Sequence, residues 1–398
     1  MTTLLEMTFA DNRSGMSLDL DVLGEKDIVR LLFSEKPAVV LQVEDAVSVC
    51  EELKLAGVNA FRIGEVNFER RFRISNAGVE FDLLVDHLRD LWYKSSYLLD
   101  RRQSGEKKAL ERYTNYKNQE LVYKFPEGFT GKYARYGIDP HRKAKTGIRA
   151  AIIREKGCQC DREMAWCMYL AGMDVKDVHM TDLVSGRETL EDVNMIVFVG
   201  GFSNSDVLGS AKGWAGAFLY NEKAKQALDR FYARPDTLSL GVCNGCQLMI
   251  ELGLITPSDA EKPRMLHNDS HKFESGFVGV EVRPSNSVLL GSLAGSRLGV
   301  WIAHGEGKFH LPYAEEHYNV ALKYAYEAYP ANPNGSDYNV AGIASADGRH
   351  LAMMPHLERS LRPWNWAWYP EERTQDEVSP WIEVFVNARK WIETNAKR

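Results

Sequence analysis

The sequence predicts an α/β protein with a mainly parallel sheet in its largest part. Two observations carry this prediction. From about residue 147 onward, short apolar runs rich in Val and Ile alternate with segments of helical spacing. Several of these runs end in glycine or in a polar side chain, which is where parallel sheets carry their functional sites. A chain of 398 residues has room for two or three domains.

Composition and charge exclude several other classes of protein. The longest apolar runs are far shorter than the roughly 20 residues of a membrane helix, and Met1–Leu20 has no signal-peptide pattern. Six cysteines are too few for a disulfide scaffold. The net charge of −6 disfavours a nucleic-acid binder. We therefore expect a cytoplasmic protein that binds neither membrane nor nucleic acid.

The first 85 residues have the pattern of a partial α+β domain. Ala38–Val43 is apolar and β-branched and predicts a buried strand, and Ala60–Val66 predicts a second one. Between them, Asp45–Ala56 has a helical apolar face, and Lys26–Phe33 predicts another helix. This part offers no cluster of His, Cys and carboxylate residues.

Residues 86–146 are predicted to connect this domain to the next one. The apolar spacing over Phe81–Gln103 predicts one long amphipathic helix. Residues 101–147 then carry twelve Lys and Arg against five acidic residues. We interpret this basic segment as a solvated linker lying on an acidic neighbour, with RNA binding as the alternative.

The third part, 147–398, supplies the alternating elements. We expect strands at Ile148–Ile153, Asn194–Val199, Thr237–Val242 and Leu351–Met354, and helices at Asp161–Ala171, Lys223–Tyr232 and Asn244–Leu252.

The strongest chemical signal is the G-x-C-x-G sequence around Cys243. It lies between a predicted strand and a predicted helix, like the nucleophile elbow of α/β hydrolases. The sharp turn brings Gly241 and Gly245 together, so both must be small. Cys243 then lies at a helix N-terminus, where the dipole favours a thiolate and the N–H of Asn244 is available to an oxyanion.

Other roles for the cysteines were compared with this one. Cys243 and Cys246 form a C-x-x-C pair typical of a redox dithiol or half a zinc site, and a buried structural cysteine is a further alternative. Cys158, Cys160 and Cys167 are also close in sequence. No second ligand pair follows at metal-site spacing, so we expect no metal.

A cysteine nucleophile needs a base, and His356 is the best-placed histidine. It follows a predicted strand, and Glu358 is close enough in sequence to orient its imidazole. The pair His304 and Glu306 is the alternative base site. The glycine-rich turn at 200–206 is a candidate for a second oxyanion donor.

These residues resemble the class I, triad-type glutamine amidotransferases. That family has its cysteine in G-x-C-x-G-x-Q, matched by Gly241–Gln247, and a later H-P-E sequence, matched by His356 and Glu358 with Leu357 in place of proline. The resemblance implies a flavodoxin-like domain with a Cys243–His356–Glu358 triad. It also implies that Gly201, Phe202, Asn244 and Gln247 bind the substrate or the oxyanion.

Further motifs are similar to the phosphoribosylformylglycinamidine (FGAM) synthase family in its large single-chain form, over about 147–398. They are Gly200-Gly201-Phe202-Ser203-x-x-Asp206, His267-Asn268-x-Ser270, Ala303-His304-Gly305-Glu306-Gly307, Asn332-Pro333-Asn334-Gly335-Ser336, Met354-Pro355-His356-x-Glu358-Arg359-Ser360 and the tail from Ser379 to Arg389. Residues 1–85 are similar, less specifically, to the end of that family's last synthetase domain.

The resemblance implies a glutaminase that supplies ammonia for the ATP-dependent conversion of FGAR to FGAM in purine biosynthesis. Glutamine is the implied substrate and the synthetase domains are the implied partners. No cofactor is expected in this chain, and ATP and Mg²⁺ belong to those other domains. The length favours a piece of a larger enzyme or half of a split one. An inactive regulatory fragment and a different Cys–His amidase or peptidase are the alternatives.

Overall fold

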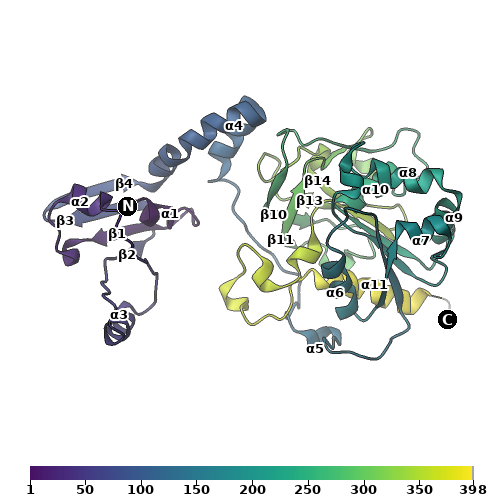
Figure 1. Ribbon diagram of the computed structural model, residues 1–398, viewed down its shortest axis with the longest axis horizontal. Helices are drawn as coiled ribbons and strands as arrows, with labels where there is room; N and C mark the ends of the chain where they lie inside the picture. Colours follow the sequence, from purple (N-terminus) through teal and green to yellow (C-terminus); the bar gives the residue numbers. More distant parts are fainter. Residues whose placement is uncertain (397–398) are drawn as a thin grey trace. The chain divides into compact units, whose positions relative to one another are not determined.

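The computed structural model describes residues 1–396, which form two compact units (Figure 1). The first unit is Met1–Arg102 and the second begins at Gln103. Their hydrophobic cores share no residue. The predicted division into three parts, 1–85, 86–146 and 147–398, stays a prediction.

The first unit is built on a four-stranded sheet in the order β2-β1-β3-β4. Its strands are β1 (Gly15–Asp19), β2 (Gly64–Asn67), β3 (Arg71–Asn76) and β4 (Val79–Leu84), and its short helices are α1 (Thr2–Glu6), α2 (Ile28–Phe33) and α3 (Ala46–Leu55). Only the β1–β3 pair is parallel. The core is small and includes Leu18, Phe72 and Ile74.

Two predictions in this unit need correction. Ala38–Val43 is not a strand, and its Val39 and Leu41 are 84% and 60% exposed. An apolar run becomes a strand only when a neighbouring strand pairs with it, and none does here among the described residues. The second predicted strand begins at Gly64 rather than Ala60. The two predicted helices are confirmed as α2 and α3.

The long helix α4 spans Val85–Asn115 and begins later than predicted, because Phe81–Leu84 pair with β3 as part of β4. Gly105 interrupts it with φ 78° and ψ 165°, a conformation open to glycine.

The basic segment 101–147 overlaps the end of α4, and from Gln103 onward it belongs to the second unit and packs within it. Lys124 and Arg297 exchange two backbone hydrogen bonds of 2.8 Å. Arg112 forms an ion pair with Glu274 at 2.9 Å, and Arg142 forms one with Asp174 at 3.0 Å. The acidic neighbours expected from the sequence are therefore present at these positions.

The second unit holds a nine-stranded sheet in the order β11-β10-β13-β14-β15-β8-β7-β5-β6. The last five strands in this order are parallel, and the first five, with β15 shared, pair antiparallel. The parallel strands are β5 (Arg149–Arg154), β6 (Asp174–His179), β7 (Met195–Phe198), β8 (Leu238–Val242) and β15 (His350–Met353). The others are β10 (Glu274–Val282), β11 (Arg297–His304), β13 (Asn319–Tyr324) and β14 (Val340–Ala344), and β9 (Arg264–Leu266) pairs with β12 (Lys308–His310).

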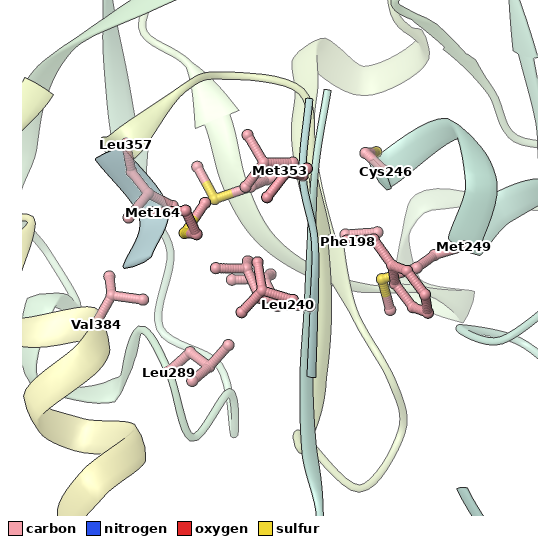
Figure 2. Close-up of a cluster of buried hydrophobic side chains, with 14 of the residues drawn as sticks. Met164, Phe198, Leu240, Cys246, Met249, Leu289, Met353, Leu357 and Val384 are labelled. Atoms are coloured by element: carbon pink, nitrogen blue, oxygen red, sulfur yellow. The ribbon is translucent and has the colours of Figure 1, made fainter. Parts of the chain in front are cut away.

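Helices cover both faces of this sheet, as expected for an α/β fold. They are α5 (Tyr133–Tyr136), α6 (Asp161–Leu170), α7 (Met180–Ser185), α8 (Lys212–Tyr220), α9 (Glu222–Ala233), α10 (Asn244–Glu251) and α11 (Ile382–Asn395). Figure 2 shows Met164 of α6 and Val384 of α11 on one side of the strands, and Cys246 and Met249 of α10 on the other.

The predicted fold class is confirmed. Each strand and helix expected after residue 147 is present, with ends that differ by at most one residue. Strand β6, helices α7, α8 and α11 and the antiparallel pairing beyond β15 were not predicted from the sequence. Strands β7, β8 and β15 are buried along their whole length, which explains their continuous apolar runs. Within residues 1–396, the longest helices are too short or too polar to cross a bilayer.

Candidate active site

Cys243 lies in the turn between β8 and α10, in a conformation that few residues adopt. Its φ is 52° and its ψ −106°, and backbone strain of this kind is concentrated at functional sites. A Cβ on Gly241 would lie 2.5 Å from the carbonyl oxygen of Gly245, and one on Gly245 would lie 2.0 Å from the carbonyl oxygen of Phe198. The close approach predicted for the two glycines is therefore present.

The sheet brings His356 to this cysteine. Strand β15 pairs in parallel with β8, with Met353 opposite Val242, so the residues that follow both strands emerge at the same edge. The backbone N–H of Cys243 donates to the carbonyl of Met353 at 3.0 Å. A Cβ added to Gly200 would lie 2.7 Å from Cε1 of His356 and 3.4 Å from Cβ of Cys243. The side chains of His356 and Cys243 thus both lie next to Gly200, which follows β7.

His356 and Glu358 form a buried pair. Nδ1 of His356 lies 2.6 Å from Oε1 of Glu358, and their side chains are 1% and 0% exposed. Burial lowers the pKa of His356, but the charges of Glu358 and of the Cys243 thiolate outweigh it and raise that pKa well above the usual value. Burial likewise raises the pKa of Glu358, and the imidazolium overcomes this effect to hold it low. Both groups are therefore charged when the thiol is ionised.

The other imidazole nitrogen has no hydrogen-bond partner. Nε2 of His356 is buried and makes no hydrogen bond within residues 1–396. Since Nδ1 lies against Glu358, Nε2 is the nitrogen that is left for a further partner.

A second cysteine, Cys160, lies beside this pair, and sequence reasoning considered it only as a metal ligand. Its Sγ accepts hydrogen bonds from Nη2 and Nε of Arg359 at 2.8 and 3.2 Å. Ligand atoms of Cys160, His356 and Glu358 lie within 4.8 Å of one another. In this structure Cys160 pairs with Arg359, and His356 pairs with Glu358. The place of Cys160 immediately before α6, in the loop that follows β5, is the signal that could have identified it.

The remaining cysteines are free thiols. Burial raises the pKa of Cys246 and of Cys167 well above the usual value, so both remain protonated at neutral pH. A redox role for the Cys243–Cys246 pair gains no support from this environment.

The residues predicted to hold the oxyanion differ in availability. The N–H of Phe202 donates to the carbonyl of Gly157 at 2.9 Å and is already used. In α10 the first internal hydrogen bond runs from the N–H of Gln247 to Cys243, which leaves the N–H of Asn244 outside the helix ladder. Gly201 has φ 140°, and a Cβ there would lie 2.6 Å from Cα of Cys158.

The side chains of Asn244 and Gln247 tie neighbouring loops to α10. Asn244 donates to Oε1 of Gln247 at 3.0 Å and accepts from the N–H of Ser203 at 3.1 Å. Nε2 of Gln247 donates to the carbonyl of Glu306 at 2.8 Å. In the structure as it stands, the Gln247 amide is engaged by the protein itself.

A cavity of about 440 Å³ opens between three segments of the chain, 202–210, 267–273 and 305–306. It is lined by Phe202, Asp206, Ser210, His267, His271, Lys272, Phe273, Gly305 and Glu306. Burial, with the nearby charge of Glu306, raises the pKa of Asp206. Asn204, Ser205 and Asp206 all have positive φ, which marks this loop as strained.

The alternative base pair, His304 and Glu306, is not formed. Burial lowers the pKa of His304 to about 4, so it is neutral. Its Nε2 lies 3.4 Å from Nδ2 of Asn334, while the carboxylate of Glu306 accepts from the N–H of Ser210 at 3.3 Å. The geometry thus favours His356.

Residues 147–392 match the CobB/CobQ-like glutamine amidotransferase domain. The chain belongs to this family. It is 40% identical to human phosphoribosylformylglycinamidine synthase, over 98% of this chain and 31% of that protein. It is 38% identical to the probable chloroplastic/mitochondrial enzyme of Arabidopsis thaliana, over 99% of this chain and 29% of that protein.

The predicted resemblance to FGAM synthases is confirmed, and the chain spans about a third of the length of these curated relatives. Among solved structures, PurLQS from Thermotoga maritima aligns with a TM-score of 0.48 and 24% identity, covering 63% of this chain and 100% of that one.

Proposed function

We propose that this amidotransferase is the glutaminase part of an FGAM synthase and that Cys243, His356 and Glu358 are its catalytic triad. The observation that carries the proposal is the buried 2.6 Å His356–Glu358 pair, placed with Cys243 against Gly200 at the edge of the sheet. A strained nucleophile, a base and a group that orients the base are what amide hydrolysis by a thiol requires.

The reaction proceeds in two stages. The Cys243 thiolate attacks the side-chain amide carbon of glutamine, and His356 gives its proton to the departing ammonia, leaving a glutamyl thioester. His356 then takes a proton from water, whose oxygen attacks the thioester; the carbon–sulfur bond breaks, glutamate leaves, and the Cys243 thiolate and the protonated His356 are restored. Glu358 keeps the imidazole oriented and its charge balanced throughout.

The negative oxygen that forms on the amide carbon needs donors. The N–H of Asn244 is at the N-terminus of α10, where unpaired N–H groups and the helix dipole favour negative charge. Gly201 is the second donor we propose, because the N–H of Phe202 is occupied. The cavity of about 440 Å³ is the proposed place for the amino-acid end of glutamine, with Phe202 as one of its walls.

The ammonia is consumed elsewhere. By the resemblance to FGAM synthases, we propose that synthetase domains of the same enzyme use it, with ATP and Mg²⁺, to convert FGAR to FGAM in the cytoplasm. The chemistry at Cys243 itself needs no cofactor. The Arabidopsis relative is named chloroplastic/mitochondrial, so the compartment differs among the relatives of this chain.

Replacing the nucleophile tests the proposal. We expect Cys243→Ala to abolish glutamate release from glutamine without changing the circular dichroism spectrum, because the smaller side chain fits the same turn. Cys246→Ala is the matched control and should retain activity. An electrophilic glutamine analogue should label Cys243 alone in mass spectrometry.

Two outcomes would contradict the assignment, and a third would favour the alternative of a chain that is inactive by itself. Labelling of Cys246 would place the nucleophile elsewhere, and equal hydrolysis of simple peptides would indicate a peptidase. If glutamate release appears only when the synthetase domains are added, this chain is inactive by itself and its glutaminase activity depends on those domains.

A further inference from the structure

The segment Ala303–Gly307 forms a wall of the active site. The Cys243 thiol donates to the carbonyl of Ala303 at 3.5 Å. The carbonyl of Glu306 accepts from Gln247 at 2.8 Å, and Gly305 and Glu306 line the cavity. Any displacement of this segment would move the groups that surround the nucleophile.

The side chain of Asn268 forms hydrogen bonds with two residues of this segment, His304 and Gly307. Asn268 is fully buried, and its Nδ2 donates to the carbonyl of His304 at 2.8 Å while its Oδ1 accepts from the N–H of Gly307 at 3.0 Å. Its backbone N–H donates to the carbonyl of Gly305 at 2.9 Å. Nδ2 also donates to the carbonyl of Lys272 at 3.0 Å, which closes the turn that carries the cavity residues of this loop.

Only an amide side chain can make this set of contacts. The His304 and Lys272 carbonyls need a donor, and the Gly307 N–H needs an acceptor. An aspartate of the same shape would keep the acceptor and place a negative oxygen against two carbonyls. An alanine would remove the buried partner of the His304 carbonyl and of the Gly307 N–H, and the loss of such a partner is costly in a dry interior.

We propose that Asn268 is a positioning residue for Cys243: it fixes the Ala303–Gly307 segment against the nucleophile and joins it to the cavity wall. This inference rests on the proposed function for its link to glutamine turnover. The contacts themselves are independent of the substrate.

Asn332 provides a matched control. It is also a buried asparagine in a turn, with Nδ2 donating to Oδ1 of Asn339 at 3.0 Å and Oδ1 accepting from the N–H of Gly335 at 3.0 Å. Its side chain makes no hydrogen bond to Cys243 or to residues 303–307 within the part of the chain that the structure describes. Asn332→Ala thus removes a comparable buried amide while it breaks no direct hydrogen bond between residue 332 and the wall.

The test compares Asn268→Ala with Asn332→Ala in the full chain. We expect kcat for glutamine hydrolysis to fall about 10- to 100-fold in Asn268→Ala. Iodoacetamide should alkylate its Cys243 faster, by about threefold or more, because the segment no longer covers a thiol that is 5% exposed. Asn332→Ala should change neither rate when the two variants are compared at equal distances below their Tm values.

Opposite changes in turnover and alkylation distinguish positioning from general loss of stability. An unaltered alkylation rate in Asn268→Ala, or an equal change in Asn332→Ala, would overturn the inference. Asn268→Asp serves as a second variant if the alanine variant does not fold. Alkylation needs no glutamine, so it decides the positioning role even if the wild-type chain releases no glutamate.

Discussion

At the scale of single residues, charge balance in a dry site decides the chemistry. His356 and Glu358 are almost completely buried, and the charge of each favours the charged form of the other. Removing one member of such a pair leaves an uncompensated charge, which is why these residues act as a unit. Arg359, which contacts Cys160, adds positive charge 3.9 Å from Glu358.

This balance predicts a specific pH effect. His356 must hold its proton while Cys243 is a thiolate, so activity falls as the pH rises through the pKa of His356. The carboxylate of Glu358 raises that pKa, and glutamine in its place has no charge. Glu358→Gln should therefore move the alkaline limb of kcat/KM to lower pH and reduce the maximal rate by about tenfold or more.

The measurement is kcat/KM for glutamine as a function of pH in both proteins. Glu222→Gln, at the surface start of α9, should leave the profile unchanged. An alkaline limb that stays in place in Glu358→Gln would mean that Glu358 does not set the charge of His356.

At the scale of elements, the elbow is held by contacts that permit no Cβ. Gly245 of α10 lies against the backbone of β7, with a hypothetical Cβ 2.0 Å from the carbonyl oxygen of Phe198. Helix and strand therefore pack more closely here than a side chain would allow, and this closeness sets the direction of the Cys243 side chain.

Gly245→Ala should push α10 away from β7. We expect a loss of about 2 to 4 kcal/mol in the free energy of unfolding, as for overpacked cores, together with loss of glutamine hydrolysis. Thermal and urea denaturation followed by circular dichroism would measure it.

Gly216→Ala in α8 is the control, since its Cβ would meet nothing closer than 3.8 Å. It should stabilise the protein by up to about 1 kcal/mol, because alanine favours helix. Equal effects of the two substitutions would show that the contact with β7 is unimportant.

At the scale of the whole molecule, the segment before the amidotransferase domain is part of that unit's structure. Phe125 packs edge-on against Trp366 with ring centroids 5.8 Å apart, and Tyr123 stacks on Trp368 at 5.2 Å. Phe129 is buried. These aromatic contacts explain why a segment with a strongly basic composition is ordered.

Two truncations test this arrangement. Residues 103–398 should fold with an unchanged Tm for the second unit, because the two cores share no residue. Residues 147–398 should have a Tm lower by about 5 to 10 °C, since the removal of residues 103–146 exposes Trp366 and its neighbours. Equal Tm values for the two truncations in calorimetry would contradict this role of residues 103–146.

The sequence by itself determined the local features of this protein. The spacing of Gly241, Cys243 and Gly245 predicted the elbow, and the strand ends predicted where His356 and Glu358 would lie, because parallel strands present their carboxyl ends at one edge. The four strands and three helices predicted after residue 147 followed from periodicity, which depends only on neighbours in the chain.

The tertiary structure decided what depends on residues far apart in sequence. It left Ala38–Val43 without a pairing strand, added the antiparallel half of the large sheet, and placed Cys160 beside His356 and Glu358. It also brought Asn268 to the Ala303–Gly307 segment. No periodicity encodes these contacts, because each depends on strand order and on packing between elements that form only when the whole unit folds.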